Sequence, residues 1–264
     1  MIDSHVHIDA KNYREGHTVA NILFQAAIAG VDRVVSPSLH MESFRELLQI
    51  RQNHPGVYPA AGVHPHEASR ARSQTILSDL KQAMLQLPVP IVGETGLEGH
   101  YDFIPLDVQL ESLDLHLEFA HAHGLPVILH CRETEEVLYH RLKAYAPNLF
   151  GVIHCFTGTW EWAQRFLELG FHIGITGIVT FKNSAQVQEV ATRTPAERLL
   201  VETDGPYLAP IPFRGKLNKP EYIPIIVKKI AELRGAHPGE VADFTTTNTE
   251  ALFGLPKHEQ KSSV

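Results

Sequence analysis

Short apolar runs alternate along the chain with longer amphipathic stretches, and turn-forming residues mark the joints between them. An apolar run of about four to eight residues is typical of a buried strand, whereas apolar residues three and four positions apart indicate one face of a helix. The pattern therefore predicts eight strand–helix units. The predicted strands are Met1–His7, Asp32–Ser36, Val57–Gly62, Pro90–Glu94, Pro126–His130, Phe150–His154, His172–Thr176 and Arg198–Thr203.

The predicted helices fall between these strands. In the stretch 105–123, Leu106, Leu110, Leu113 and Leu117 recur every three to four positions, and Gly124 is placed to end the helix. Similar stretches predict helices near 17–29, 41–53, 73–86, 133–145, 159–169 and 184–192, and two more follow the last strand, near 220–234 and 238–253.

Eight strand–helix units in 264 residues fit a (β/α)8 TIM barrel. The alternative is a doubly wound open sheet, which is expected to carry a glycine-rich phosphate loop after its first strand. The run Asp3-Ser4-His5-Val6-His7 contains no glycine, which favours the barrel. We expect one barrel domain over residues 1–256 and a polar C-terminal tail over 257–264.

Composition and charge narrow the class of protein. Hydrophobic residues make up 44% of the chain and charged residues 20%, as in ordinary globular domains. The formal net charge of −7 argues against a broad basic surface for nucleic acid. No apolar run approaches the length of about 18 residues that a membrane span needs, and residues 1–8 do not resemble a secretory signal. We expect a cytoplasmic protein with reduced cysteines, no membrane association and no obligate protein partner.

Metal-binding side chains close several predicted strands. His5 and His7 lie two positions apart on the first strand and therefore point to the same side. In a barrel, the carboxyl ends of all strands meet at one mouth, so strand-end residues far apart in sequence become neighbours. Each residue alone could be an ordinary polar strand end, but all of them belong to metal-binding types. The candidate ligands are His5, His7, Glu94, His130, His154 and Asp204.

Imidazole and carboxylate ligands without thiolate favour magnesium, manganese or zinc. Six ligands suffice for two divalent ions about 3.5–4 Å apart, a separation typical of two-metal hydrolytic sites. Such ions acidify a water, and Asp204 is our candidate to accept its proton. Glu94 leaves the fourth strand between the histidines of the first strand and those of the fifth and sixth, so we expect it to touch both ions and count it as catalytic.

Further residues near the strand ends are candidates for binding substrate. His64 and His66 end the third strand, where they could contact a phosphate, orient a metal ligand or simply line a polar rim. Arg132 could bind a phosphate oxygen or pair with a neighbouring glutamate. Arg214 and Asn218 lie in a proline-rich loop that could form a wall of the cleft.

In order and combination, a series of motifs resembles the TatD family of metal-dependent hydrolases over nearly the whole chain. The motifs are Asp3-Ser4-His5-Val6-His7, Gly62-Val63-His64-Pro65-His66, Gly93-Glu94-Thr95-Gly96-Leu97, Leu125-Pro126-Val127-Ile128-Leu129-His130-Cys131-Arg132, His154-Cys155-Phe156-Thr157-Gly158, Glu202-Thr203-Asp204-Gly205-Pro206-Tyr207-Leu208, Arg214-Gly215-Lys216-Leu217-Asn218-Lys219-Pro220 and Asn248-Thr249-Glu250-Ala251-Leu252-Phe253.

The resemblance implies an amidohydrolase-like barrel and the same six ligands. It also implies a magnesium- or manganese-dependent deoxyribonuclease with 3′-to-5′ exonuclease activity, because family members are described in this way. The sequence departs from the family at Glu98, where the usual pattern is Gly-Leu-Asp followed by an aromatic pair. We expect this change to alter substrate positioning in the loop after the fourth strand and to leave the ligands untouched.

Three functions compete at this stage. The first is a dinuclear metal phosphodiesterase that acts on DNA ends or another small phosphodiester. The second is an ester or amide hydrolase, including a D-aminoacyl-tRNA deacylase, since the same activated water attacks either centre. The third is a noncatalytic metal-binding or nucleic-acid-binding module, against which the candidate base Asp204 argues, because a binding module needs no proton acceptor.

Overall fold

Eight parallel strands form the centre of the molecule. The computed structural model describes residues 1–9, 13, 17–72, 78, 81, 82, 84, 85, 87 and 89–257. Strands β1 to β3 pair in order, as do β4 to β8, and the bridges Val6–Gly205 and Ala61–Val92 join the two groups into a closed barrel. The predicted (β/α)8 barrel is thus confirmed. The strands are β1 (Ile2–Asp3), β2 (Arg33–Pro37), β3 (Val57–Ala60), β4 (Val92–Glu98), β5 (Val127–Arg132), β6 (Gly151–Ile153), β7 (His172–Ile175) and β8 (Leu199–Val201).

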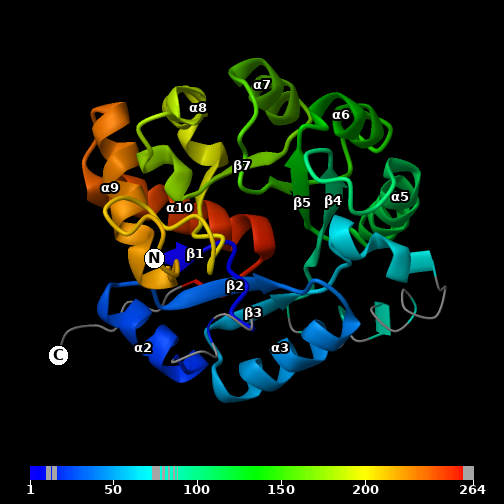
Figure 1. Ribbon diagram of the computed structural model, residues 1–264, viewed down its shortest axis with the longest axis horizontal. Helices are drawn as coiled ribbons and strands as arrows, with labels where there is room; N and C mark the ends of the chain where they lie inside the picture. Colours follow the sequence, from blue (N-terminus) through cyan, green and yellow to red (C-terminus); the bar gives the residue numbers. More distant parts are fainter. Residues whose placement is uncertain are drawn as a thin grey trace.

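Helices surround this barrel (Figure 1). The α-helices are α2 (Val19–Ile28), α3 (Met41–Asn53), α5 (Leu106–His123), α6 (Glu135–Lys143), α7 (Trp160–Glu168), α8 (Ala185–Arg193), α9 (Ile223–Arg234) and α10 (Pro238–Phe253). Shorter 3-10 turns are η1 (Pro65–Arg72), η2 (Gly177–Thr180), η3 (Ala196–Arg198) and η4 (Pro220–Tyr222). These bounds confirm eight of the nine predicted helices to within a few residues. The ninth, predicted over 73–86, falls largely outside the described residues, as does the tail from residue 258 onward.

Alternation along the strands separates two hydrophobic layers. One layer fills the barrel interior and includes Ile128 of β5, Val152 of β6 and Leu200 of β8. Their neighbours, such as Val127 and Ile153, face outward and pack against the helices. Because side chains alternate with period two, the residues two positions beyond each inward one also face the barrel axis, at the carboxyl end. This geometry delivers His130, His154 and Glu202 to the barrel mouth.

Strand β4 departs from its predicted course. We expected it to end at Glu94, but it continues to Glu98 and pairs with β5 as far as Arg132. Gly96 permits this pairing, because its φ is +144° and a Cβ there would lie 2.1 Å from the carbonyl oxygen of His130. The register also shifts between Val92 and Thr95. The shift brings Glu94 inward three positions after the inward residue Ile91.

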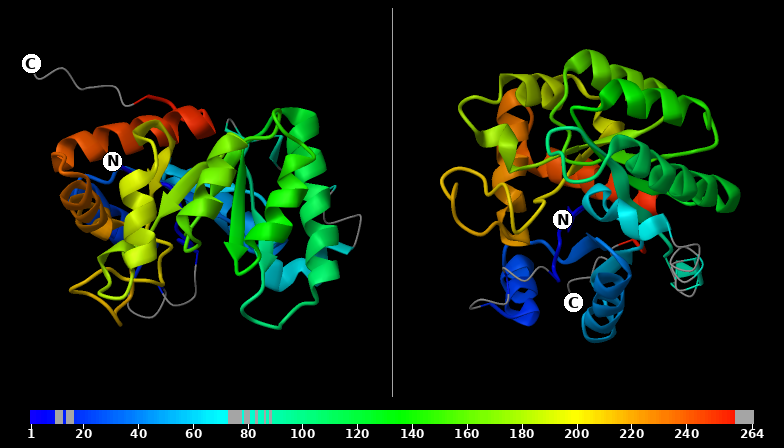
Figure 2. Two further views of the ribbon diagram at one scale, coloured as in Figure 1. Left: turned by 90° about the horizontal axis from the view of Figure 1, so that it is seen from above. Right: turned by 45° about the vertical axis from the view of Figure 1, so that its right-hand side comes forward.

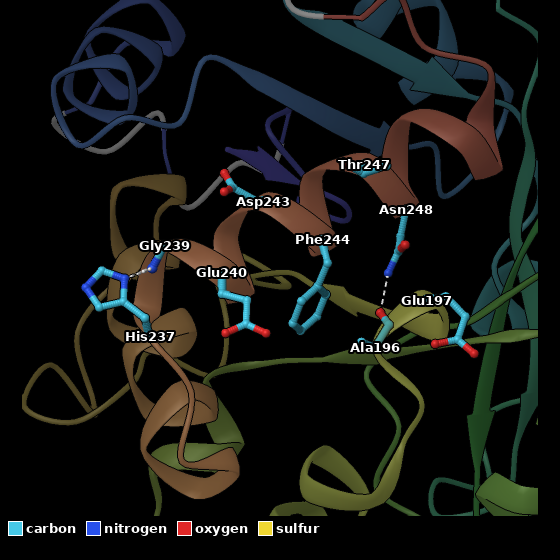
Figure 3. Close-up of a pocket in the computed structure, with 9 residues that line it drawn as sticks. All are labelled: Ala196, Glu197, His237, Gly239, Glu240, Asp243, Phe244, Thr247 and Asn248. Atoms are coloured by element: carbon cyan, nitrogen blue, oxygen red, sulfur yellow. Dashed lines mark hydrogen bonds between the residues drawn. The ribbon is translucent and has the colours of Figure 1, made fainter.

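Helix α10 closes the end of the barrel opposite the mouth (Figure 2, left). Leu252, Phe253 and the following Leu255 belong to the interior layer and fill the floor beneath the strands. A cleft of about 720 Å³ lies at this end, where η3 leads into β8, and Figure 3 shows the side chains that line it along α10. The cleft is therefore remote from the mouth. No helix in the described part of the chain is both long and apolar enough to cross a membrane.

Candidate metal centre

The structure brings all six predicted ligands to the barrel mouth. On β1 and the residues after it, His5 Nε2 and His7 Nε2 lie 3.3 Å apart, as expected for two residues on the same side. Each nitrogen is 3.7 Å from Asp204 Oδ1, which follows β8. His5, His7 and Asp204 thus form one group whose ligand atoms converge closely enough to hold a metal ion.

Glu94 lies at the centre of the cluster, and its two carboxylate oxygens face different histidines. Oε2 lies 3.3 Å from His5 Nε2 and 3.5 Å from His7 Nε2. Oε1 lies 3.0 Å from His130 Nδ1 and 2.6 Å from His154 Nε2. This is the position that the strand order predicts for a carboxylate between two metal sites.

A second group contains His64, which we had proposed only as a substrate or orienting residue. Its Nε2 lies 3.5 Å from Glu94 Oε1, and His64, Glu94 and His130 converge closely enough to hold an ion. The predicted neighbour His66 lies farther out, with Nε2 3.6 Å from Glu98 Oε2. The third strand therefore contributes to the centre more directly than its sequence position indicates.

Two carboxylates that we did not predict as site residues also belong to the cluster. Glu202 faces the barrel axis two positions after Leu200, and accepts hydrogen bonds from the Cys155 amide at 2.5 Å and from Ser4 Oγ at 3.1 Å. Gly174 makes room for it, because a Cβ there would lie 2.7 Å from the carboxylate. The period-two alternation of β8 is the signal that could have identified Glu202.

Glu98 is the other unpredicted member. It was noted in the sequence only as a departure from the family pattern, yet its Oε2 lies 3.2 Å from His130 Nε2. Its place could not be foreseen, since we expected β4 to end four residues earlier. The extended strand brings Glu98 onto the same side as Glu94.

The buried charges shift one another's protonation. Burial alone would raise the pKa of Glu94, but His154, His64 and His5 hold it well below its ordinary value. Burial alone would lower the pKa of His154, but Glu94 and Glu202 raise it to about 9. Burial lowers the pKa of His5 to about 3. The cluster without metal therefore pairs ionised Glu94 with protonated His154 and keeps His5 neutral.

Burial disfavours the ionised forms of Glu202 and Asp204. It raises the pKa of Glu202 to about 7 and also raises that of Asp204. When ionised, Glu94, Glu98, Glu202 and Asp204 together carry four negative charges. Two dications would balance this charge.

These residues fit divalent ions on a direct structural test. Buried polar atoms almost always have hydrogen-bond partners, yet Glu94 Oε2 has none in the described structure. Glu94 Oε2 is oriented into the cluster toward His5 and His7. Oxygen and nitrogen donors of this kind suit magnesium, manganese or zinc.

A hydrogen-bonded scaffold holds Asp204 in place. Asp3 accepts hydrogen bonds from the Thr203 amide at 2.9 Å and from Thr203 Oγ1 at 2.5 Å, which ties β1 to the turn after β8. Asp204 itself has φ 55°, in the left-handed region that aspartate tolerates better than most residues. The turn is thus held on the side of β1 that carries His5.

Asn218 corrects one expectation. We predicted that it contacts substrate, but its side chain is fully buried and both ends of its amide are used. Nδ2 donates to the Thr203 carbonyl at 2.7 Å, and Oδ1 accepts from the Lys219 amide at 2.9 Å. The residue anchors the proline-rich loop to the turn that carries Asp204.

The two predicted arginines lie at different parts of the rim. The Arg132 guanidinium lies 4.9 Å from the centre of the Tyr101 ring, while Glu133, the neighbour with which we considered a pair, lies 2.7 Å from His100. Arg214 is exposed in the loop after β8 and lies over the Phe181 ring at 4.6 Å. Each guanidinium rests on an aromatic face near the mouth.

Comparison with known proteins agrees with this geometry over nearly the whole chain. The family profile TatD related DNase matches residues 2–254. The metal-dependent hydrolase YabD of Bacillus subtilis is 33% identical over 256 residues, which cover 97% of this chain and 99% of that protein. The 3′-5′ ssDNA/RNA exonuclease TatD of Citrobacter rodentium is 32% identical, with 97% and 98% covered.

Solved structures show the same likeness. The crystal structure of YjjV, a TatD homologue from Escherichia coli, has a TM-score of 0.89 at 33% identity and covers 97% of this chain and 98% of that one. The phosphotriesterase homology protein of Escherichia coli has a TM-score of 0.67 at 13% identity, with 96% and 98% covered, and shares the fold alone. With its amidohydrolase-like barrel and its buried cluster of histidines and carboxylates, the chain belongs to the TatD family of metal-dependent hydrolases.

Proposed function

We propose that this protein is a deoxyribonuclease that hydrolyses phosphodiester bonds at the 3′ ends of single-stranded DNA, with two divalent ions bound by His5, His7, His64, Glu94, His130, His154 and Asp204. The observation that carries the proposal is the position of Glu94, with one carboxylate oxygen facing His5 and His7 and the other facing His64, His130 and His154. Ions bound there would act as Lewis acids and acidify a water molecule.

Asp204 is suited to accept the proton of the attacking water. Its side chain is 15% exposed, whereas those of Glu94, Glu98 and Glu202 are each 1% exposed. Of these four carboxylates, Asp204 is therefore the one that solvent reaches from the mouth.

Groups at the rim can hold the phosphate. His66 is about one-third exposed, and Arg132 is half-buried on the neighbouring side of the mouth. We assign both to contacts with phosphate oxygens, for which a guanidinium is well shaped. Because the whole chain carries a net charge of −7, a duplex would be repelled over most of its length, whereas a strand end needs only the mouth.

The proposal of DNA as the substrate rests on sequence similarity to a named exonuclease as well as on the net charge of the chain. The Citrobacter rodentium relative, named as a 3′-5′ ssDNA/RNA exonuclease, covers nearly the whole chain at 32% identity. The same ligands would also serve ester or amide hydrolysis. The decisive comparison is therefore among substrates.

The test is a substrate panel. Metal-stripped protein is reconstituted with Mg²⁺, Mn²⁺ or Zn²⁺ and assayed on single-stranded DNA labelled at the 5′ end, RNA, a D-aminoacyl-tRNA and a simple phosphodiester. We expect the highest metal-dependent rate on DNA, with products shortened one nucleotide at a time. A higher rate on the aminoacyl ester assigns the deacylase instead, and no metal-dependent turnover of any substrate rejects a hydrolase. Asp204→Asn, assayed in parallel, excludes a contaminating nuclease.

A further inference from the structure

The loop between β4 and α5 is tied down at both ends by one buried side chain. Gln109 Oε1 accepts from the Glu98 amide at 2.8 Å, and Gln109 Nε2 donates to the carbonyl oxygens of Glu98 at 3.1 Å and Ile104 at 2.8 Å. Figure 2 (left) shows this loop and the loop after β8 projecting from the same end of the barrel. The residues between 98 and 104 are thus held in place beside the mouth.

Glu98 fixes the path of the loop from inside. Its Oε1 accepts from the amides of His100 at 2.6 Å and Tyr101 at 3.2 Å, while its Oε2 lies 3.2 Å from His130 Nε2. Between Glu98 and His100, the Gly99 amide donates to the Arg132 carbonyl at 2.8 Å. The carboxylate therefore links the loop backbone directly to a candidate metal ligand.

This anchored loop presents two aromatic rings to solvent. Tyr101 and Phe103 stack with ring centres 5.1 Å apart and planes 2° from parallel. They are 42% and 63% exposed, although most large apolar side chains of the chain are buried. The His66 ring meets Phe103 edge-on at 4.9 Å, and the Arg132 guanidinium lies 4.9 Å from the Tyr101 ring centre. Because Arg132 covers Tyr101, Phe103 is the more open ring.

The chemistry of this patch fits a nucleotide. A rigid exposed ring offers a stacking face to any base, and an adjacent guanidinium offers a charge to the phosphate that the base carries. A purely apolar partner would offer no opposite charge to the guanidinium. A chain of contacts connects this patch to the metal centre, because His66 lies against Glu98 and Glu98 lies against His130.

We propose that Phe103, supported by Tyr101, is the stacking site for the nucleobase next to the scissile phosphodiester. The inference rests on the proposed function and adds the part of the substrate that is recognised. The site recognises a strand that carries bases rather than a bare sugar-phosphate chain. Stacking is tolerant of sequence, so all four bases are accepted. Glu98 and Gln109 act as positioning residues, since they hold the loop and do not contact the base.

The test measures binding without hydrolysis. Fluorescein-labelled five-residue DNA strands, identical except that one carries abasic residues at its last two 3′ positions, are titrated in EDTA at low salt with the full-length protein. The ratio of the two dissociation constants cancels the charge repulsion that both strands share. We expect the normal strand to bind wild-type protein about tenfold more tightly than the abasic one.

Variants assign this ratio to one ring. Phe103→Ala should reduce it to about one by weakening only the base-bearing strand, and Phe103→Trp should keep it. Phe24→Ala is the matched control, because Phe24 is 61% exposed on α2 and lies outside the patch. A ratio of one in the wild type, no binding of either strand, or equal losses for both strands in Phe103→Ala overturns the proposal.

A kinetic arm separates this proposal from the function beneath it. With metal, Phe103→Ala should raise KM about tenfold on the normal strand and leave kcat nearly unchanged. If metal-loaded wild type cleaves no phosphodiester, the proposed deoxyribonuclease fails, while the binding ratio in EDTA still decides whether Phe103 stacks a base.

Discussion

Replacing Glu94 by glutamine tests whether this carboxylate joins two metal sites. The substitution keeps the shape and one ligand oxygen but removes one negative charge from the middle of the cluster. The side chain is almost fully buried, so water cannot make good the loss. An ion between the two groups of histidines would lie within about 4 Å of the carboxylate, because the imidazole nitrogens themselves lie 2.6–3.5 Å from its oxygens.

The expected magnitude follows from Coulomb's law. A unit negative charge and a divalent ion about 4 Å apart interact by about 8 kcal/mol at an effective dielectric constant of about 20, twice the energy of two unit charges. That energy corresponds to about five to six orders of magnitude in metal affinity. The ions also repel each other, so the loss should fall mainly on the second one. Glu94→Gln should therefore keep one tight site and lose the other, along with most of the hydrolysis.

The number of metal sites is measured by titrating Mn²⁺ into the protein in a calorimeter, and circular dichroism shows whether the fold is kept. The spectrum should not change, since the hydrophobic layers on both sides of the strands do not include Glu94. Glu189→Gln is the matched control, because Glu189 is half exposed on α8 and pairs with Arg193 at 2.7 Å. Two tight sites with normal turnover in Glu94→Gln would show that the carboxylate does not bridge.

Three further predictions concern single residues. Asp204→Asn should lower turnover by about two to four orders of magnitude while calorimetry still detects bound metal, and near-normal turnover would assign the base elsewhere. Burial lowers the pKa of His172 to about 4 from an unfolded value near 6.5. Its contribution of about 3 kcal/mol to the free energy of unfolding is therefore complete above pH 6.5 and is lost as the pH falls toward 4. The free energy of urea unfolding of His172→Gln should depend less on pH over this range than that of the wild type, and an equal pH dependence of the two proteins would contradict the assignment. Asn218→Ala leaves buried groups unpaired at Thr203 and Lys219 and should cost about 2 kcal/mol in unfolding free energy as well as lower turnover, whereas a loss of neither would mean that the loop holds without it.

The barrel could be predicted because its signal is repetitive. Each strand is a short apolar run, and the following helix shows apolar residues at three and four positions, as in α5. The prediction ended β4 at Glu94, whereas in the structure Gly96 allows β4 and β5 to pair closely beyond that residue. A glycine can either weaken a strand or permit the close approach of a neighbouring backbone, and only the neighbouring strand distinguishes the two.

The site was foreseen as far as strand ends could indicate it. His5, His7 and Glu94 follow from position and residue type, and the structure brings them together. Glu202 and Glu98 were not foreseen as members, because each lies within a strand or its extension, where sequence reasoning expects structural roles. Asn218 was misjudged because a polar residue in a loop suggests exposure, whereas the tertiary structure buries it.

The contacts that close the barrel join residues that lie about 200 positions apart in the sequence. The hydrogen bond from the Thr203 amide to Asp3 spans 200 residues, and that from Ser4 Oγ to the Val201 carbonyl spans 197. Contacts of this range form slowly, since the loop entropy must be lost before they stabilise anything. During synthesis, a chain that has not yet reached β8 has His5 and His7 but no Asp204 to complete their group. The group of His5, His7 and Asp204 can therefore form only late, after β8 has been made and the barrel has closed.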